Sequence, residues 1–276
     1  MAEKLITGKE RPIGVFDSGV GGLSVLRALE RRLPGENYIY FGDTARAPYG
    51  NRSAEEIRRF NKEIGSWLLE QGCKMLLVAC NTSTVLGMEV IKAMAAIPVF
   101  GMMEATLAGS LSAEEDSVWP IGFIATKGTV ESGAYQKAFG GIAQDKLFYA
   151  QACPEFVPYV EKGDIDGQEV MQAVRTYLAP LREAGIRTLI LGCTHYPFLA
   201  SAISSFLGPG IRLVDPALAL ADMVEASLKG EGLLNDGLGG AGNRRMFYCS
   251  GDKESFRLVG GALYGCPMGE VRRKVF

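Results

Sequence analysis

One pattern occurs twice in the chain, at Leu77-Val78-Ala79-Cys80-Asn81-Thr82 and again at Ile190-Leu191-Gly192-Cys193-Thr194-His195. Each copy is an apolar run typical of a buried strand, followed by a cysteine and by polar residues that can cap a helix. The copies lie 113 positions apart, and Pro12-Ile13-Gly14-Val15-Phe16 is matched 108 positions later by Pro120-Ile121-Gly122-Phe123-Ile124. Two nearly equal offsets indicate an internal duplication.

Short apolar runs alternate with longer amphipathic segments in both parts of the chain. The runs predict strands at residues 12–16, 38–41, 75–79, 98–101, 121–125, 146–150, 188–192 and 246–250. The amphipathic segments predict helices at residues 23–33, 55–70, 129–139, 167–183 and 253–263. Ser53 with Glu56 predicts a capping box at the start of the second of these helices. This alternation is typical of parallel strands joined by crossover helices.

The duplication predicts an α/β fold of two similar domains with largely parallel sheets, related by a pseudo-twofold axis. We expect the first domain to comprise residues 1–101, completed by 210–276, and the second to comprise residues 102–209. Ligands of open α/β sheets bind at the carboxyl ends of the strands, which is where both cysteines of the repeated pattern fall. The functional site is therefore expected in the cleft between the domains.

The composition is that of an ordinary globular protein, with 276 residues, 47% hydrophobic and 22% charged, and a net charge of -2. Lysines and arginines are spread along the chain, so no surface for nucleic acid is indicated. The sequence lacks the apolar segments of a signal peptide or a membrane span, which predicts a cytoplasmic protein with a small-molecule ligand and no membrane partner. Residues 230–243 contain six glycines and predict a flexible surface loop.

The six cysteines are expected to be reduced, because a chain of this length without an export signal rarely depends on disulfides. No two of them form Cys-x-x-Cys and the only histidine is His195, so a structural zinc site of the usual spacing is not indicated. Zinc held by Asp17, Cys80, Cys193 and His195 is an alternative, although no third soft ligand with sensible spacing supports it. No motif for a pyridoxal lysine is evident either. We therefore expect no metal and no cofactor.

Cys80 and Cys193 each follow a strand and precede the expected start of a helix. The positive end of a helix favours thiolate, which predicts a cysteine pKa lowered from ~8.5 towards ~7. A buried structural role is the alternative for either cysteine alone. Core packing gives no reason to repeat both the thiol and its polar flank, so the repetition favours a chemical role. His195 is a candidate for proton transfer near neutral pH, with a structural histidine as its alternative.

A glycine-rich turn, Asp17-Ser18-Gly19-Val20-Gly21-Gly22, follows the first strand. Such a turn is also found in dinucleotide-binding proteins, and Asp43 ends the second strand where a ribose-binding carboxylate would lie. Ser24 stands where that motif has its last glycine, and Asp17 would place a negative charge beside the pyrophosphate. We therefore favour a loop for a small polar substrate, in which Asp17 assists a base or binds an ammonium group.

Two further turns lie at expected strand ends. Arg46-Ala47-Pro48-Tyr49-Gly50 follows the second strand and has the composition of a turn or a simple loop. Thr126 and Thr129 occupy the second-half turn that corresponds to Asp17 and Ser18. Their hydroxyls and the nearby backbone N–H groups suit a carboxylate ligand.

Four segments resemble the glutamate racemases in sequence, order and spacing. They are Gly14-Val15-Phe16-Asp17-Ser18-Gly19-Val20-Gly21-Gly22, Phe41-Gly42-Asp43-Thr44-Ala45-Arg46-Ala47-Pro48-Tyr49-Gly50, Ala79-Cys80-Asn81-Thr82 and Leu191-Gly192-Cys193-Thr194-His195-Tyr196-Pro197. The resemblance extends from about residue 12 to 260. It implies interconversion of L- and D-glutamate for bacterial peptidoglycan, by a homodimer of two-domain subunits without a cofactor. The glycine-rich segment 230–243 and the ending at 265–276 depart from the usual pattern, so the resemblance implies nothing about regulation or subunit contacts there.

The resemblance also assigns roles to individual residues. Cys80 and Cys193 are the expected bases, and Asp17, His195 and Glu161 are the other expected catalytic residues. The expected substrate contacts, including the two threonines discussed above, are Asp17, Ser18, Pro48, Tyr49, Gly50, Asn81, Thr82, Thr126, Thr129, Thr194 and His195.

Inverting a stereocentre without turning the substrate requires one base on each face, one of them thiolate and the other thiol at any moment. Asp17 is expected to assist Cys80, and His195 to assist Cys193. A racemase for aspartate or another amino acid, and a non-catalytic amino-acid-binding protein, are the alternatives. A second role in binding a macromolecule as a regulator is neither supported nor excluded by the sequence.

Overall fold

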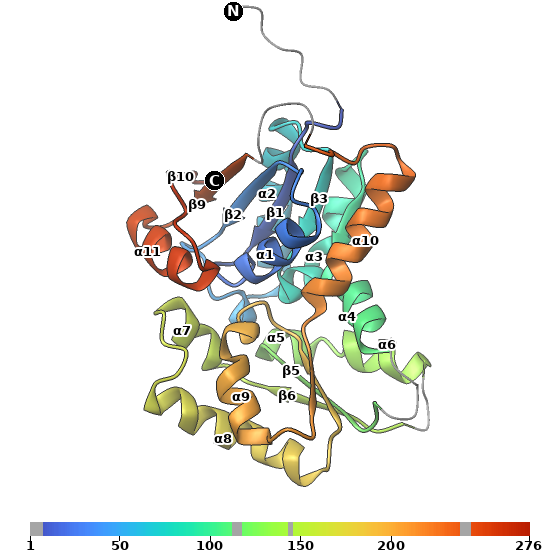
Figure 1. Cartoon of the computed structure of the whole chain (residues 1–276), viewed down its shortest axis with the longest axis vertical. Coiled ribbons are helices and arrows are strands. Elements are labelled where there is room, and N and C mark those ends of the chain that lie inside the picture. Colours follow the sequence, from blue (N-terminus) through green and yellow to red (C-terminus); the bar gives the residue numbers. More distant parts are fainter. Residues whose placement is uncertain (1–7, 112–117, 143–145, 238–243) are drawn as a thin grey trace, which may run out of the picture.

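The computed structural model describes residues 8–111, 118–142, 146–237 and 244–276, which form two parallel sheets in separate lobes (Figure 1). The first sheet has the order β10-β9-β2-β1-β3-β4 and consists of β1 (Ile13–Asp17), β2 (Tyr38–Gly42), β3 (Met75–Val78), β4 (Val99–Gly101), β9 (Arg245–Cys249) and β10 (Val271–Arg273). The second has the order β6-β5-β7-β8 and consists of β5 (Ile121–Ala125), β6 (Phe148–Ala152), β7 (Thr188–Leu191) and β8 (Arg212–Val214).

The two sheets share one topology. The order β2-β1-β3-β4 in the first sheet corresponds to β6-β5-β7-β8 in the second, and all strand pairs are parallel. The predicted α/β class with two parallel sheets is confirmed, and the shared order supports the duplication. The pseudo-twofold relation between the halves stays a prediction.

Helices cover the sheets and connect their strands (Figure 1). They are α1 (Leu23–Arg32), α2 (Ala54–Glu70), α3 (Asn81–Met94), α4 (Met102–Ser110), α5 (Lys127–Glu131), α6 (Ala134–Ile142), α7 (Phe156–Glu161), α8 (Gln168–Glu183), α9 (Ala200–Leu207), α10 (Pro216–Gly230) and α11 (Lys253–Tyr264), with short 3₁₀ turns η1 (Tyr49–Asn51) and η2 (Tyr196–Leu199). The capping box of Ser53 and Glu56 is present at the start of α2, as predicted. Among the described residues, no helix is long and apolar enough to cross a membrane.

The single helix predicted at 129–139 is wrong. The chain forms α5 and then α6, with Gly133 between them at a φ of 66°. A positive φ lies outside the right-handed helical region, so the helix stops at this glycine. The loop predicted at 230–243 begins as α10 ends at Gly230, but residues 238–243 lie outside the described part of the chain.

The return of the chain to the first sheet comes later than residue 210. β8 pairs in parallel with β7, so this strand belongs to the second sheet. α10 follows it and packs against both α1 and α4 (Figure 1). We propose that the second domain ends after Val214, and we retain residue 101 as the end of the first segment.

A buried ion pair lies at the amino ends of the first sheet's strands, opposite the cysteines. The Lys74 ammonium lies 2.5 Å from the Glu36 carboxylate and donates to the carbonyls of Lys9 and Leu233 at 2.7 and 2.9 Å. Burial raises the pKa of Glu36 and lowers the pKa of Lys74, although each partner opposes the shift of the other. Removing one partner of such a pair leaves the other charge without compensation.

The variant Lys74→Met should therefore lower the free energy of unfolding by about 3–5 kcal/mol, which urea denaturation measures. The control is Lys127→Met, which removes an exposed partner of Glu131. An exposed pair of this kind contributes about 0–1 kcal/mol. Equal losses of stability in the two variants would contradict the assignment of Lys74 and Glu36 as a buried ion pair.

Candidate active site

The carboxyl ends of the two sheets meet at a small pocket that contains both cysteines of the repeated pattern. It is lined by Ser18, Pro48, Tyr49, Gly50, Cys80, Asn81, Thr82, Thr126, Val157, Cys193, Thr194 and His195. Its free volume is about 10 Å³, close to the space of a single water molecule. An amino acid can enter only if the two halves or their loops separate. Of the expected site residues, Asp17, Thr129 and Glu161 lie behind this lining.

Cys80 is the N-cap of α3 and lies two residues after the end of β3 at Val78. Its side chain is 5% exposed. Burial raises the pKa of the Cys80 thiol to about 12, and the negative charge of Asp17 adds to the shift. The N–H and hydroxyl of Ser83 lower the pKa, but by less. The predicted lowering of the pKa by the helix end is wrong for Cys80, because burial outweighs it, and the side chain is a thiol at neutral pH.

Cys193 belongs to a chain of polar groups that ends at a partly exposed carboxylate. Its Sγ lies 3.7 Å from Nδ1 of His195, and Nε2 of His195 lies 2.6 Å from Oε1 of Glu161. Glu161 is the last residue of α7 and also accepts the Val20 N–H at 2.9 Å. The His195 ring is therefore held between a sulfur and a carboxylate. The contacts come from three segments that are distant in sequence, at residues 193–195, at Glu161 and at Val20.

The pKa of His195 is raised well above its ordinary value of 6.5. Burial alone would lower this pKa, but the hydrogen bonds and the charges of Cys193 and Glu161 raise it by more. The imidazolium form therefore persists above pH 6.5. These contacts stabilise the fold fully below pH 6.5, and their contribution is lost as the pH rises through the folded-state pKa.

Nuclear magnetic resonance can test this directly, because the chain has one histidine. In protein without a histidine tag, ¹⁵N shifts of His195 should remain those of the imidazolium form at pH 7.5. Cys193→Ala and Glu161→Gln should each lower the pKa, since each removes a group that favours the cation. A titration midpoint near 6.5 that is unchanged in both variants would contradict the arrangement.

Asp17 ends β1 and lies fully buried between the two halves. One carboxylate oxygen accepts the Gly19 N–H at 3.0 Å, and the other accepts the Thr194 hydroxyl at 3.1 Å. Its charge also raises the pKa of Cys80. Asp17 is therefore electrostatically coupled to Cys80 in the first half and hydrogen-bonded beside Cys193 in the second.

The glycine-rich turn is filled by side chains of the second half. A Cβ on Gly19 would lie 1.9 Å from Oε1 of Glu161, and a Cβ on Gly21 would lie 2.2 Å from Nδ1 of His195. Asp43, the other element of the dinucleotide alternative, is buried and accepts from Ser250 and Arg46 at 2.7 and 2.6 Å. The glycines thus allow His195 and Glu161 to approach the turn, and no space for a pyrophosphate remains there.

The variant Gly21→Ala should consequently lower kcat/KM by about 10²-fold, because a catalytic group displaced by about 1 Å costs this much. The added Cβ has to displace the His195 ring, whose Nδ1 faces the Cys193 sulfur. Gly140→Ala in α6 is the control, since a Cβ there meets nothing within 4 Å. Steady-state kinetics of both variants provide the comparison, and normal activity of Gly21→Ala would mean that the position of His195 is unimportant.

Polar groups from both halves line the rest of the pocket. The Thr82 hydroxyl lies 3.0 Å from that of Thr126 and 3.1 Å from that of Thr129. Gly50 approaches Thr126 so closely that a Cβ would lie 2.7 Å from the Thr126 Cβ. The Tyr49 hydroxyl is bonded to Asp43, so Tyr49 offers its ring and backbone to the pocket, and not a free hydroxyl.

Two residues support the pocket in ways that the sequence did not indicate. Tyr135 donates to Asn81, and Asp43, considered above only as a ribose-binding carboxylate, is the shared acceptor for Tyr49, Arg46 and Ser250. No sequence signal marks Tyr135, which is 54 positions from Asn81 and has no polar neighbour in a repeated motif.

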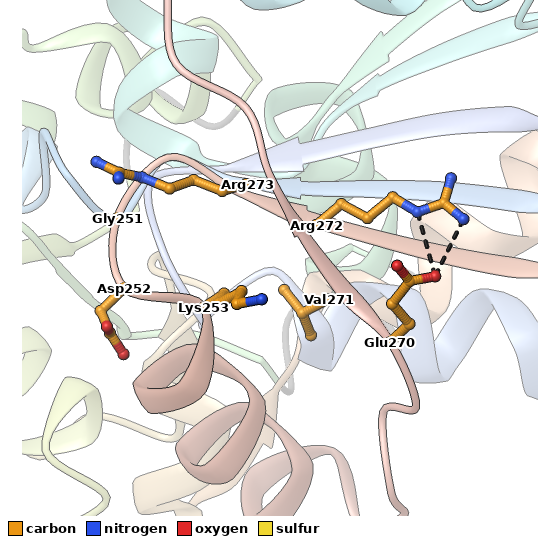
Figure 2. Close-up of a pocket in the computed structure, with 7 residues that line it drawn as sticks. All are labelled: Gly251, Asp252, Lys253, Glu270, Val271, Arg272 and Arg273. Carbon is orange, nitrogen blue, oxygen red and sulfur yellow. Dashed lines mark hydrogen bonds and ion pairs between the residues drawn. The ribbon is translucent and has the colours of Figure 1, made fainter.

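A larger groove of about 600 Å³ lies elsewhere, between the start of α11 and the edge strand β10 (Figure 2). Arg272 in this groove is paired with Glu270 at 3.0 Å. None of the predicted site residues lines it. Within the part of the chain that the structure describes, no group of three histidine, cysteine or acidic side chains is arranged to hold a metal ion.

The chain is similar to known racemases over nearly its whole length. The profile of the Asp/Glu/Hydantoin racemase family matches residues 13–224. A glutamate racemase of Thermoanaerobacter pseudethanolicus is 44% identical over 256 residues, which are 92% of this chain and 94% of that protein. The glutamate racemase of Francisella tularensis, solved in complex with D-glutamate, is 33% identical with a TM-score of 0.87, covering 97% of this chain and 98% of that one. That of Thermus thermophilus, in complex with β-chloro-D-alanine, is 41% identical with a TM-score of 0.84 and covers 97% and 98%.

Proposed function

The chain belongs to the Asp/Glu/Hydantoin racemase family and is an isomerase, and we propose that it interconverts L-glutamate and D-glutamate with two cysteine bases. One observation carries this proposal. Cys80 and Cys193, one from each half, line the same small pocket together with hydrogen-bond donors. Glutamate racemases resemble the chain over more than nine-tenths of its length, and one of them was solved with D-glutamate bound.

The two cysteines have different surroundings, and this difference determines which of them carries a proton in the resting enzyme. Cys80 is a thiol, since burial raises its pKa, whereas Cys193 faces a histidine whose pKa is raised by that contact. We propose a resting state in which Cys80 carries its proton and Cys193, which lies beside the His195 imidazolium, acts as the base. From the resemblance to glutamate racemases we further propose that Cys193 removes the proton of L-glutamate and Cys80 that of D-glutamate, so the enzyme in this state is ready for L-glutamate.

The reaction then proceeds by two proton transfers. The Cα–H bond of L-glutamate breaks, its proton passes to the Cys193 sulfur, and the electron pair moves into the α-carboxylate. The Cys80 thiol delivers its proton to the opposite face of Cα, which yields D-glutamate, a Cys193 thiol and a Cys80 thiolate. Donors fixed at the strand ends stabilise the charge that develops on the carboxylate. Reversal of the same steps converts D-glutamate.

Asp17 and His195 are proposed to assist different transfers. His195 contacts the Cys193 sulfur and stabilises its negative charge. Asp17 disfavours the Cys80 thiolate through its own negative charge, and this same charge makes that thiolate a stronger base once it forms. Glu161 keeps the His195 ring oriented through Nε2. Glu161 and Asp17 therefore act on the cysteines and on their partners from behind the pocket.

The wider role follows from the same proposal. We propose that D-glutamate made by this chain supplies peptidoglycan synthesis, and that the protein acts in the cytoplasm, as a homodimer and without a cofactor. The support for these points is the similarity to glutamate racemases and the two-thiol pocket.

Polarimetry of the purified protein with L-glutamate tests the activity. The optical rotation should decay to zero, and exhaustive chelation should not change the rate. L-aspartate is the comparison substrate, because a racemase for aspartate is the alternative on the same fold. Decay with aspartate but not with glutamate would reassign the substrate, and tight binding of glutamate without decay would indicate a binding protein.

A further inference from the structure

Tyr135 brings a second-half hydroxyl to the active site from behind its lining. The side chain comes from α6, is completely buried and packs against the Phe123 ring at a centroid distance of 4.4 Å. Its hydroxyl lies 2.5 Å from Oδ1 of Asn81, the first residue of α3. This bond connects the second half of the chain to a side chain that lines the pocket beside Cys80.

The direction of this hydrogen bond follows from its length and from the neighbouring groups. A separation of 2.5 Å fits an O–H···O bond and is too short for an N–H···O bond. The Thr106 hydroxyl lies 2.6 Å from the Met102 carbonyl, which can only accept, so Thr106 donates there. Thr106 is farther from the tyrosine, at 3.4 Å. The Tyr135 hydroxyl therefore donates to the oxygen of the Asn81 amide.

Fixing the amide oxygen also fixes the amide nitrogen. With Oδ1 held by Tyr135, Nδ2 of Asn81 points to the other side, and it is buried without a hydrogen-bond partner among the described residues. A buried donor without a partner is unfavourable in the empty protein and becomes satisfied when an acceptor enters. The acceptor that an amino-acid substrate offers is a carboxylate oxygen.

We propose that Tyr135 is a positioning residue that sets the orientation of the Asn81 amide, so that the pocket presents an N–H donor to a substrate carboxylate. This inference rests on the proposed racemase function and deepens it. The reverse orientation of the amide would present an oxygen, which repels a carboxylate and attracts an ammonium group. Tyr135 thus determines which end of the amino acid the Asn81 position accepts.

The variant Tyr135→Phe tests the proposal, because it removes the hydroxyl and keeps the ring that packs on Phe123. We expect the KM for glutamate to rise about 10-fold with little change in kcat, since the lost contact binds substrate and transition state alike. Tyr38→Phe is the matched control. Tyr38 is equally buried, but its hydroxyl donates to the Leu33 carbonyl at 3.0 Å, far from the pocket, so both constants should stay unchanged.

A double-mutant cycle separates positioning from a general structural role. In an Asn81→Ala background, adding Tyr135→Phe should not raise the KM further, because Tyr135 acts through Asn81. A rise of the same size in both backgrounds, or no rise in the single variant, would overturn the proposal. Asn81→Asp keeps an acceptor for Tyr135 but replaces the donor, and it should raise the KM more than Tyr135→Phe does. A wild-type KM in Asn81→Asp would equally overturn the proposal.

Wild-type kinetics keep this test separate from that of the function. If the wild-type protein does not interconvert glutamate, the proposed function fails before Tyr135 is examined. If the wild type is active and Tyr135→Phe is indistinguishable from it, only the role of Tyr135 is refuted. Thermal melting of each variant shows whether the fold is kept.

Discussion

Replacement of either Cys80 or Cys193 by alanine should lower kcat/KM for both enantiomers by about 10³-fold or more, since each variant lacks one of the two proton carriers. In each variant, racemisation of L-glutamate and of D-glutamate should be lost together, because every turnover uses both thiols. The remaining cysteine still faces one side of Cα but has no partner on the other side.

Cys249→Ala is the matched control for these variants. Cys249 is also fully buried, in β9 of the first sheet, but it does not line the pocket. Its replacement should affect stability and leave turnover nearly unchanged. Near-normal racemisation by Cys80→Ala or Cys193→Ala, with an intact circular dichroism spectrum, would remove that cysteine from the mechanism.

Replacement of His195 by asparagine should lower kcat/KM by about 10²-fold, because a group that assists a proton transfer contributes about 10²–10⁴-fold. Asparagine keeps an N–H donor near the position of Nδ1, but it cannot carry the charge that His195 holds between Cys193 and Glu161. L- and D-glutamate have equal free energies, so kcat/KM must stay equal in the two directions for every variant. Assistance to one transfer therefore cannot appear in the ratio of these constants.

Isotope effects on kcat/KM can show which transfer is affected. If His195 assists only the transfer at Cys193, His195→Asn should make that step more rate-limiting. Cα-deuterated L-glutamate should then show a larger isotope effect than with wild type, and Cα-deuterated D-glutamate a smaller one. Asp17→Asn should give the mirror pattern, since Asp17 acts on Cys80. The same response of both substrates in both variants would leave His195 and Asp17 as general binding groups.

Much of the fold could be predicted because its central strands are buried on both faces. Strands β1, β3 and β7 are apolar apart from Asp17 at the end of β1 and Thr188 at the start of β7, which is the pattern of parallel strands covered by helices. The repetition of that pattern also placed Cys80 and Cys193 at equivalent strand ends. β8 escaped prediction because it is a three-residue edge strand that begins with the exposed Arg212.

The properties that sequence could not provide depend on contacts between distant segments. The pKa of Cys80 is set by how completely the folded halves exclude water, and local sequence shows only the helix end that follows. In the sequence, Gly19 and Gly21 resemble part of a phosphate-binding loop. In the structure, Glu161 and His195 occupy the space beside them. The Tyr135–Asn81 hydrogen bond connects α6 with α3 across the two halves, and the hydrophobic pattern of the sequence does not indicate this contact.

The most direct test of the two-base mechanism is the fate of the Cα proton in heavy water. L-glutamate with a normal Cα–H is incubated with the wild-type protein, and mass spectrometry measures deuterium in each enantiomer during the first few per cent of conversion. Two bases predict D-glutamate that is almost fully deuterated at Cα, while the remaining L-glutamate keeps most of its protium. D-glutamate that retains the substrate's own proton would show that one group carries it between the faces, and would contradict the assignment of Cys80 and Cys193 as separate bases.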